Sequence, residues 1–546
     1  MIVRDIVNFN RDNYYNGAVQ MEWFYDEKKV GKIAKSYVFH GPKYYGVSSN
    51  DVKTGEHKLL DTASFTKIIS DKLCGNNTNN NFVLTIAGYG TGKSHLAVTL
   101  GALFSGQKEF ADIVLGNIAS VDLETANSII EKGIQRNLVI ALNGMSNFNL
   151  DAEVLKCVRL ALQQNNISDE ILRSITKTYD VVRYFINGNF VNYQEEFEKA
   201  ANAFAVSHKG EILKKYLLEN IENDKRVVDI VNVVFSLVTG DSLHWDKGIS
   251  AGDIILKVSE ELCGEGKPFN KILILFDEFG RYIEYVAANP LIAGDASLQQ
   301  IFEAVQSANG RALFVGFVQY ELEAYLSHID KSANVIRYVG RYSSSEKYYI
   351  SSNFETILAN LLEKSDSSEY EKIIGGALNR YANFHKKMHA SLLRWTGNKI
   401  KKNVWTNDGL YKKVVMEGCY PLHPLTVWLL SNSSVWMQQR STIAFCSEMY
   451  DRIASNEIEG EWLPYVYPVD IIDSGIYSEM LSSEEKGLVM SQNCMLYNEI
   501  LIKVGEKLSR EERQLLKAIL IAKIGGFSFY DKEDAVVAFR YLSNLR

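Results

Sequence analysis

The stretch FVLTIAGYGTGKSHLAVTLGALF, residues 82–104, decides the fold of this chain. Its first five residues are a short, mostly apolar run, which is typical of a strand buried on both faces of a parallel sheet. Three glycines follow at alternate positions before Lys93 and Ser94, and the apolar residues after them favour a helix. The order of strand, glycine-rich loop and helix is the one that a phosphate-binding cradle requires.

The loop at residues 87–94 matches the P-loop, or Walker A, pattern GxxxxGK[ST] except at its first position, where Ala87 replaces glycine. Backbone N–H groups of such a loop point into a concavity of phosphate size, because glycines accept backbone angles that other residues avoid. The positive end of the following helix strengthens this anion site. We therefore predict an ATP site whose contacts come from Gly88, Tyr89, Gly90, Thr91, Gly92, Lys93, Ser94 and His95. The alternative is a glycine turn that matches the pattern by chance.

Four side chains have distinct expected tasks. We expect Lys93 to reach the β- and γ-phosphates as a point charge, and Ser94 to place its hydroxyl on Mg²⁺. A second apolar run, KILILFDE at residues 271–278, ends in two carboxylates, as a Walker B motif does. We expect Asp277 to hold Mg²⁺ through its water shell and Glu278 to polarise the attacking water. The alternative is a strand that simply ends in acidic surface residues, and the P-loop upstream disfavours it.

Further apolar runs at residues 138–142 and 312–318 are also strand-like, and helical patterns separate them. This alternation predicts an α/β fold with a doubly wound parallel sheet of the P-loop NTPase kind. Residues 143–271 are far too many for an ordinary connection and are mostly helical in pattern, so we place a helical insertion there. The other expected parts are an N-terminal module at 1–80, an ATPase core at 81–142 and 272–352, and a mainly helical lid region at 353–500.

These motifs resemble those of the AAA+ ATPases, in which a further strand lies between the Walker A and Walker B strands and ends in a polar sensor. The run LFVGFVQ at residues 313–319 fits that strand and makes Gln319 the candidate sensor 1, although this family more often uses Asn, Ser or Thr. Arg337 and Arg341 lie where the family carries an arginine finger, which neutralises transition-state charge across the interface of a homo-oligomer. Surface arginines in weak ion pairs are the alternative for each.

A narrower resemblance rests on three short motifs, FDEFGRY at 276–282, YPLHP at 420–424 and QQRS at 438–441. They are similar to motifs of the large ATPases encoded in bacterial phage-defence loci of the BREX and phage-growth-limitation type, whose core is akin to the origin-recognition branch of AAA+. The resemblance implies that Arg440 is a sensor 2 residue of the lid and that residues 501–546 begin a winged-helix domain. It also implies that other defence-system proteins are partners.

Charge and composition limit the remaining classes of function. A net charge of -7 and a pI near 5.9 argue against a surface that coats nucleic acid throughout, but leave room for a local basic groove. The basic residues at 386–402, interleaved with Trp395 and Trp405, suit either a single-strand binding surface or a solvated helix face over a tryptophan core, and we favour the second. DNA stays open as a partner. His385 and His389 have metal-ligand spacing but lack the Glu of a zinc protease.

Cysteine usage and hydropathy bear on the compartment. The six cysteines are scattered without a CxxC pair, which indicates neither a disulfide framework nor a structural zinc site and fits a reducing cytoplasm. No apolar run approaches the roughly 20 residues needed to span a bilayer, so we expect a cytoplasmic protein without a membrane partner.

Three functions compete on these observations. The first is a Mg²⁺-dependent ATPase whose cycle drives conformational change in a multi-protein assembly, in bacterial defence against phage. The second is an ATP-bound switch or scaffold with little turnover. The third is a DNA-stimulated translocase, whose turnover would fall steeply with salt.

Overall fold

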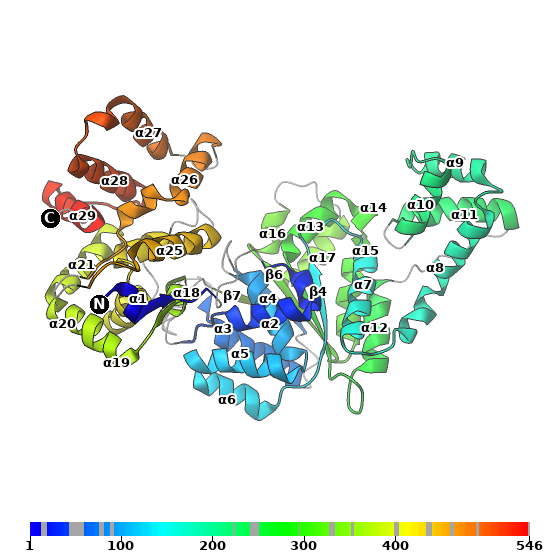
Figure 1. Cartoon of the computed structure of the whole chain (residues 1–546). Helices are drawn as coiled ribbons and strands as arrows, with labels where there is room; N and C mark the ends of the chain where they lie inside the picture. The colour runs from blue at the N-terminus through cyan, green and yellow to red at the C-terminus, as the bar shows by residue number, and fades with distance from the viewer. Residues whose placement is uncertain are drawn as a thin grey trace.

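The computed structural model describes residues 1–11, 19–42, 59–75, 81–87, 92–221, 224–240, 250–293, 295–326, 333–350, 354–397, 403–432, 439–458, 463–487 and 491–543. These residues form three bodies in a row: a C-terminal body of helices, a central α/β body, and a small helical lobe at the far end (Figure 1). The first and last helices, α1 (Val3–Ile6) and α29 (Lys532–Ser543), both lie in the C-terminal body. The chain therefore starts in the C-terminal body, then forms the α/β body and the helical lobe, and ends in the C-terminal body.

A six-stranded parallel sheet forms the centre of the α/β body. Its strands along the chain are β2 (Leu59–Leu60), β3 (Phe82–Ile86), β4 (Leu138–Asn143), β5 (Ile272–Asp277), β6 (Ala312–Val318) and β7 (Glu346–Ile350). Their spatial order is β2-β7-β3-β6-β5-β4, and all neighbouring pairs are parallel. The α/β class is confirmed, and each of the four runs predicted as strands is one. The strand β6 lies between β3 and β5, which is the expected place for the sensor strand.

Alternate residues of each strand enter two separate cores, because side chains on a strand point to opposite faces. Val83 and Leu273 pack into one core, whereas their neighbours Leu84 and Ile274 pack into the other. The first core is covered by η1 (Met21–Tyr25), α2 (Glu27–Ser36), α3 (Thr62–Cys74), α4 (Lys93–Phe104), α5 (Lys108–Val121) and α6 (Leu123–Lys132). The second is covered by α7 (Leu150–Gln164), α12 (Ala251–Leu262), α13 (Phe279–Ala288), α14 (Pro290–Ala293), α15 (Asp295–Ser307), α16 (Leu322–Tyr325) and α17 (Ala333–Ser343). Helices therefore cover both faces of the parallel sheet, as in a doubly wound arrangement.

The lobe is the centre of the predicted helical insertion. It consists of α8 (Glu170–Asn189), α9 (Gln194–Ala203), α10 (Gly210–Asn220) and α11 (Lys225–Thr239), which share a hydrophobic core of their own. The helix α8 links the two bodies, since Leu172 packs into the sheet core and Ile186 into the lobe core. The insertion expected at 143–271 is thus narrower than its predicted bounds, because α7 and α12 at its two ends cover the sheet.

The C-terminal body is built around one hydrophobic core. Its elements after α1 are β1 (Val7–Phe9), α18 (Phe354–Leu361), β8 (Leu362–Lys364), α19 (Ser367–Tyr370), η4 (Glu371–Gly375), α20 (Gly376–Arg380), α21 (Ala382–Trp395), α22 (Asn403–Thr406), α23 (Asp408–Leu410), η5 (Tyr411–Gly418), α24 (Pro424–Asn432), α25 (Gln439–Ile453), η6 (Pro468–Asp473), α26 (Gly475–Glu485), α27 (Asn493–Val504), η7 (Gly505–Lys507), α28 (Arg510–Ile524) and α29. The strand β1 pairs antiparallel with β8, and Val3 to Phe9 pack into the same core as α28 and α29.

Two expected domain boundaries differ from this arrangement. The stretch expected as one module at 1–80 is divided, because residues 3–9 belong to the C-terminal body while residues 21–74 cover one face of the sheet. The lid region at 353–500 and the segment from residue 501 share a single core rather than forming separate domains. In both cases the hydrophobic contacts join segments that lie far apart along the chain.

Two features outside the sheet concern the cysteines and the membrane. All six cysteines are unpaired, and five of them are buried. Among the helices of the described residues, none has the length and apolar character that crossing a membrane requires.

Candidate functional site

The predicted phosphate loop joins β3 to α4. All five residues of β3 are buried, and α4 begins at Lys93. The residue before it, Gly92, has a φ of +80°, a left-handed conformation that glycine adopts without steric penalty. The residues outside the described part of this loop are Gly88, Tyr89, Gly90 and Thr91. The described residues keep the expected order of strand and helix, with the amino end of α4 at the carboxyl edge of the sheet.

The first turn of α4 lies against the end of β5. The Ser94 hydroxyl hydrogen-bonds the carboxylate of Asp277, the last residue of β5. The backbone N–H of Glu278 donates to Oδ1 of Asp277 at 3.0 Å. Lys93 is only 7% exposed and Asp277 only 3% exposed, and their charges interact. The two sequence motifs therefore meet in one buried site.

Burial dominates the ionisation of both charged groups in this site. It raises the pKa of Asp277 to about 6, although the hydrogen bond from Ser94 and the charge of Lys93 oppose the rise. It also lowers the pKa of Lys93, against the attraction of Glu278 and Asp277. A buried carboxylate carries its charge at a cost unless a cation compensates it. Ser94 and Asp277 therefore present oxygen donors where Mg²⁺, which prefers oxygen ligands, would relieve an unfavourable buried charge.

Glu278 connects the sheet to the next helix through an unusual backbone conformation. Its φ of +50° lies in the left-handed region, which is uncommon for a residue with a side chain. Both of its carboxylate oxygens accept a hydrogen bond from Nε2 of Gln319 at 3.1 Å. Gln319 directly follows β6, the strand adjacent to β5. The structure thus brings the predicted sensor into direct contact with the predicted base.

Two glycines leave space for this turn: Gly280, which lies within the motif at 276–282, and Gly144, which no sequence pattern indicated. A methyl group on Gly144 would overlap the carbonyl oxygen of Glu278 and lie 2.9 Å from its carbonyl carbon. A methyl group on Gly280 would overlap the ring of Tyr325 and lie 2.7 Å from its hydroxyl oxygen. Contacts this short do not occur for real Cβ atoms. The backbone around Glu278 is therefore enclosed on both sides by close packing.

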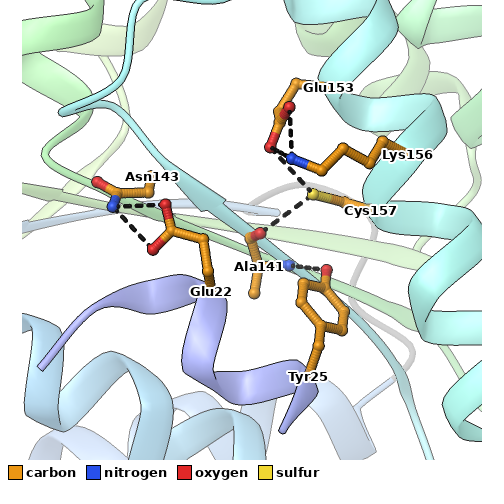
Figure 2. A network of polar contacts seen from close by, with 7 residues as sticks. All are labelled: Glu22, Tyr25, Ala141, Asn143, Glu153, Lys156 and Cys157. Carbon is orange, nitrogen blue, oxygen red and sulfur yellow. Dashed lines mark hydrogen bonds and ion pairs between the residues drawn. The ribbon is translucent and has the colours of Figure 1, made fainter.

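The outer strand β4 is held by the N-terminal helix η1, as Figure 2 shows. Asn143 ends β4 opposite Asp277 in the register, and its Nδ2 donates to both carboxylate oxygens of Glu22 at 2.8 and 3.0 Å. The backbone N–H of Ala141 donates to the Tyr25 hydroxyl at 2.9 Å. Unpaired edge groups of a sheet need partners of this kind. Sequence reasoning missed this contact, whose one signal was a polar residue at the end of an apolar run.

The helix α7 holds the same strand from the other side (Figure 2). The Cys157 thiol donates to the carbonyl oxygen of Ala141 at 3.3 Å. Lys156 and Glu153 form an ion pair at 2.9 Å beside it. Burial raises the pKa of Cys157 to about 12, so this side chain stays a thiol at neutral pH. The network fixes β4 next to the site.

The two candidate arginine fingers differ in their surroundings. Both lie on α17, whose Tyr338 and Tyr342 pack into the sheet core. Nη1 of Arg341 pairs with Oε1 of Glu303 on α15 of the same chain at 2.9 Å. Arg337 is exposed. The structure therefore engages Arg341 within the chain and leaves Arg337 accessible from outside it.

Two further predicted nucleotide contacts need comment. The side chain of His95 is directed away from the loop, since its Nε2 donates to the carbonyl oxygen of Ile33 on α2 at 2.8 Å. Burial lowers the pKa of His95 to about 4, so the ring is neutral. The prediction that the His95 side chain contacts ATP is therefore wrong. Only the backbone N–H of His95, in the first turn of α4, stays available to a phosphate. Arg440 lies in α25, but its side chain is outside the described residues.

The weaker motifs of the C-terminal body are structural. Trp395 and Trp405 are buried in its core, and Lys386, Lys387 and Arg394 are exposed, as expected of a solvated helix face over a tryptophan core. The other predicted lysines, Lys399, Lys401 and Lys402, lie outside the described residues. Nε2 of His389 donates to the carbonyl oxygen of Trp405 at 2.7 Å, and its ring stacks on Tyr411 with centroids 3.8 Å apart. His385 is partly buried, and this burial lowers its pKa to about 4. Within the described part of the chain, no group of three or more His, Cys, Asp or Glu could hold a metal ion.

Comparison with known proteins adds no family assignment. Neither the scan against protein-family models nor the search of curated proteins finds a match to this chain. The geometry of the site and the sequence motifs are therefore the basis of the functional proposal.

Proposed function

We propose that this chain is a Mg²⁺-dependent ATPase with a P-loop core of the AAA+ kind. The single observation that carries the proposal is the hydrogen bond between Ser94 on α4 and Asp277 on β5. It joins the two motifs whose side chains the proposal needs side by side, although they lie far apart in the sequence. The strand order, with β6 between β3 and β5, supports the same assignment.

Each residue of the site has a task that its surroundings support. Gly92 and the first turn of α4 direct backbone N–H groups toward the carboxyl edge of the sheet, where phosphates would bind. Lys93 neutralises phosphate charge from a buried position, in which electrostatic interactions are stronger than in water. Ser94 and Asp277 would hold Mg²⁺. When bound, this ion supplies positive charge to the β- and γ-phosphate oxygens.

Glu278 is the proposed general base. Gln319 approaches both of its oxygens through a single amide nitrogen, so each oxygen keeps a lone pair that can accept a proton from water. The carboxylate therefore has a fixed orientation beside Asp277 and stays able to orient the attacking water. Arg337 is the proposed finger, since Arg341 pairs with Glu303. A finger acting in trans makes the active form a homo-oligomer.

The first test compares ATP binding and turnover in three variants. We expect Lys93→Ala to weaken ATP binding by about 10- to 100-fold, because a charge-assisted contact to phosphate is lost. We expect Glu278→Gln to keep ATP affinity and lose about 10²- to 10⁴-fold in turnover, because a general base is removed. Lys108→Ala, which removes an exposed lysine at the start of α5, is the control for lost surface charge.

Calorimetry measures the affinities and phosphate release measures turnover. Unchanged ATP affinity and turnover in Lys93→Ala would refute the proposed site. Equal losses of binding and turnover in Glu278→Gln would make Glu278 a structural residue. An ATP-bound switch is the competing function, and it predicts tight binding with negligible phosphate release in the wild-type chain.

We also propose that this ATPase acts within a larger assembly of proteins. The motifs at 276–282 and 420–424 support a role in bacterial phage defence with partner proteins. The corresponding test is plating of phage on cells that carry the intact defence locus with wild-type or Lys93→Ala protein. Loss of protection in the variant is the expected outcome, and equal protection would refute the role. DNA-stimulated turnover, measured in parallel, would support the translocase instead.

A further inference from the structure

The loop after β6 contains a partly buried hydrogen bond that the proposed chemistry has not used. The hydroxyl of Tyr325 accepts a hydrogen bond from the backbone N–H of Gln319 at 2.8 Å. It accepts a second one from the backbone N–H of Tyr320. These are consecutive residues at the point where β6 ends and its chain turns into α16. One phenol oxygen therefore fixes the backbone of the residue whose side chain holds Glu278.

The ring of Tyr325 packs against the segment that follows the Walker B strand. It lies against Gly280, two residues after Glu278, so closely that no side chain at position 280 would fit. Glycine is unfavourable inside a helix, yet here it occupies the first turn of α13 with an ordinary helical conformation. Its role is therefore to leave space for the ring. Leu322 and Leu326, on either side of Tyr325 in the chain, are buried and hold α16 in the sheet core.

We infer that Tyr325 is a positioning residue for the catalytic base, acting through Gln319, and this inference rests on the proposed ATPase function. The contacts form a chain from the Tyr325 hydroxyl to the Gln319 backbone, and from the Gln319 amide to both oxygens of Glu278. The glutamine side chain has one more rotatable bond than asparagine, and two more than serine or threonine, which are the residues usual for a sensor. An anchored backbone restricts that extra freedom and holds the amide on the carboxylate.

Tyr325→Phe tests this inference, because it keeps the ring on Gly280 and removes only the acceptor. We expect kcat to fall about 10-fold, since the base is less well oriented, while the KM and Kd for ATP stay within twofold of wild type. Tyr285→Phe is the matched control, since it removes a hydroxyl from a partly buried tyrosine of α13 that is not the acceptor for Gln319. Its kcat should stay within twofold of wild type.

A double-mutant cycle shows whether the effect passes through Gln319. If Tyr325 acts through that side chain, Tyr325→Phe should change kcat less than twofold in a Gln319→Ala background. Gly280→Ala supplies an independent perturbation, because it displaces the ring while keeping the hydroxyl, and we expect the same fall in kcat at constant ATP affinity.

Several results would overturn the assignment. The first is a kcat of Tyr325→Phe equal to that of wild type. The second is a loss of kcat from Tyr325→Phe that is as large in the Gln319→Ala background as in the wild-type background. The third is a joint loss of ATP affinity and Tm in Tyr325→Phe, which would show that the hydroxyl supports the fold. Failure of the proposed function is distinguishable from these outcomes. If the wild-type chain does not hydrolyse ATP, both proposals fail. If the wild-type chain hydrolyses ATP and Lys93→Ala does not, the ATPase proposal holds and the Tyr325 variants test only the role of Tyr325.

Discussion

Removing the buried carboxylate of Asp277 should make the nucleotide-free protein more stable and inactive. Burial raises the pKa of Asp277 from 3.8 to about 6. The folded state therefore binds this proton more tightly than the unfolded state does. Between these two pKa values the free energy of unfolding falls as the pH rises, and above about pH 6 the whole loss is present. The carboxylate is retained at a cost in stability, which fits a group selected to bind a cation.

The magnitude follows from the shift. A difference of about 2 pKa units corresponds to about 3 kcal/mol at 1.36 kcal/mol per unit. Asp277→Asn keeps the shape of the side chain and an acceptor for Ser94 but removes the charge. At pH 8 it should raise the free energy of unfolding by up to about 3 kcal/mol, or the Tm by about 6–12 °C for a domain of 150–250 residues. At pH 5, where the folded carboxyl is mostly protonated, the gain should be about half as large.

Differential scanning calorimetry at pH 8 and pH 5, without nucleotide or Mg²⁺, measures this gain. Asp112→Asn on the exposed side of α5 is the control, and its Tm should match wild type at both pH values within the effect of about 0.5 kcal/mol typical of surface changes. A gain that is equal at the two pH values, or a variant that is less stable at pH 8, would refute the reasoning. Mg²⁺ with ATP should then raise the Tm of the wild-type chain and leave that of Asp277→Asn unchanged, since a ligand stabilises only the protein that binds it.

Two further outcomes follow from other contacts. Arg337→Ala should lower turnover at least 10-fold without changing ATP affinity. The turnover of Arg341→Ala should stay within twofold of wild type, because this variant loses only the ion pair with Glu303. A phosphate-release assay that gives the opposite result would exchange the roles of the two arginines. Trp395→Ala should destabilise the C-terminal body by about 3–5 kcal/mol in denaturant unfolding, because a fully buried indole is lost, while leaving ATP affinity unchanged. A loss of single-stranded DNA binding without a loss of stability would contradict that structural role.

The residues that the sequence predicted to lie in one site, and that the structure brings together, share one physical property. Lys93, Ser94, Asp277 and Glu278 all follow or end a buried parallel strand. The carboxyl ends of parallel strands lie at one edge of the sheet, so a pattern of apolar runs followed by polar residues predicts which side chains meet. Gln319 obeys the same rule at the end of β6, and it does contact Glu278.

His95 shows where this rule stops. It follows Ser94 directly, but each residue of a helix is rotated by about 100° from the one before, so its side chain faces α2 instead of the loop.

The contact between Glu22 and Asn143 was beyond prediction for a different reason. It joins an N-terminal 3₁₀ helix to the sheet edge over a long sequence separation, and no local pattern in either segment specifies the partner.

The glycines around Glu278 explain why the site is more constrained than its motifs suggest. Read from the sequence alone, Gly280 is a weak helix former just after a strand, and Gly144 is an ordinary turn residue. In the folded chain both are needed for space: Gly144 lies against the carbonyl oxygen of Glu278, and Gly280 lies against the ring of Tyr325. Close packing on both sides holds Glu278 in a left-handed conformation that a residue with a side chain would otherwise leave. The orientation of the proposed base is therefore set by neighbours that take no part in binding phosphate or metal.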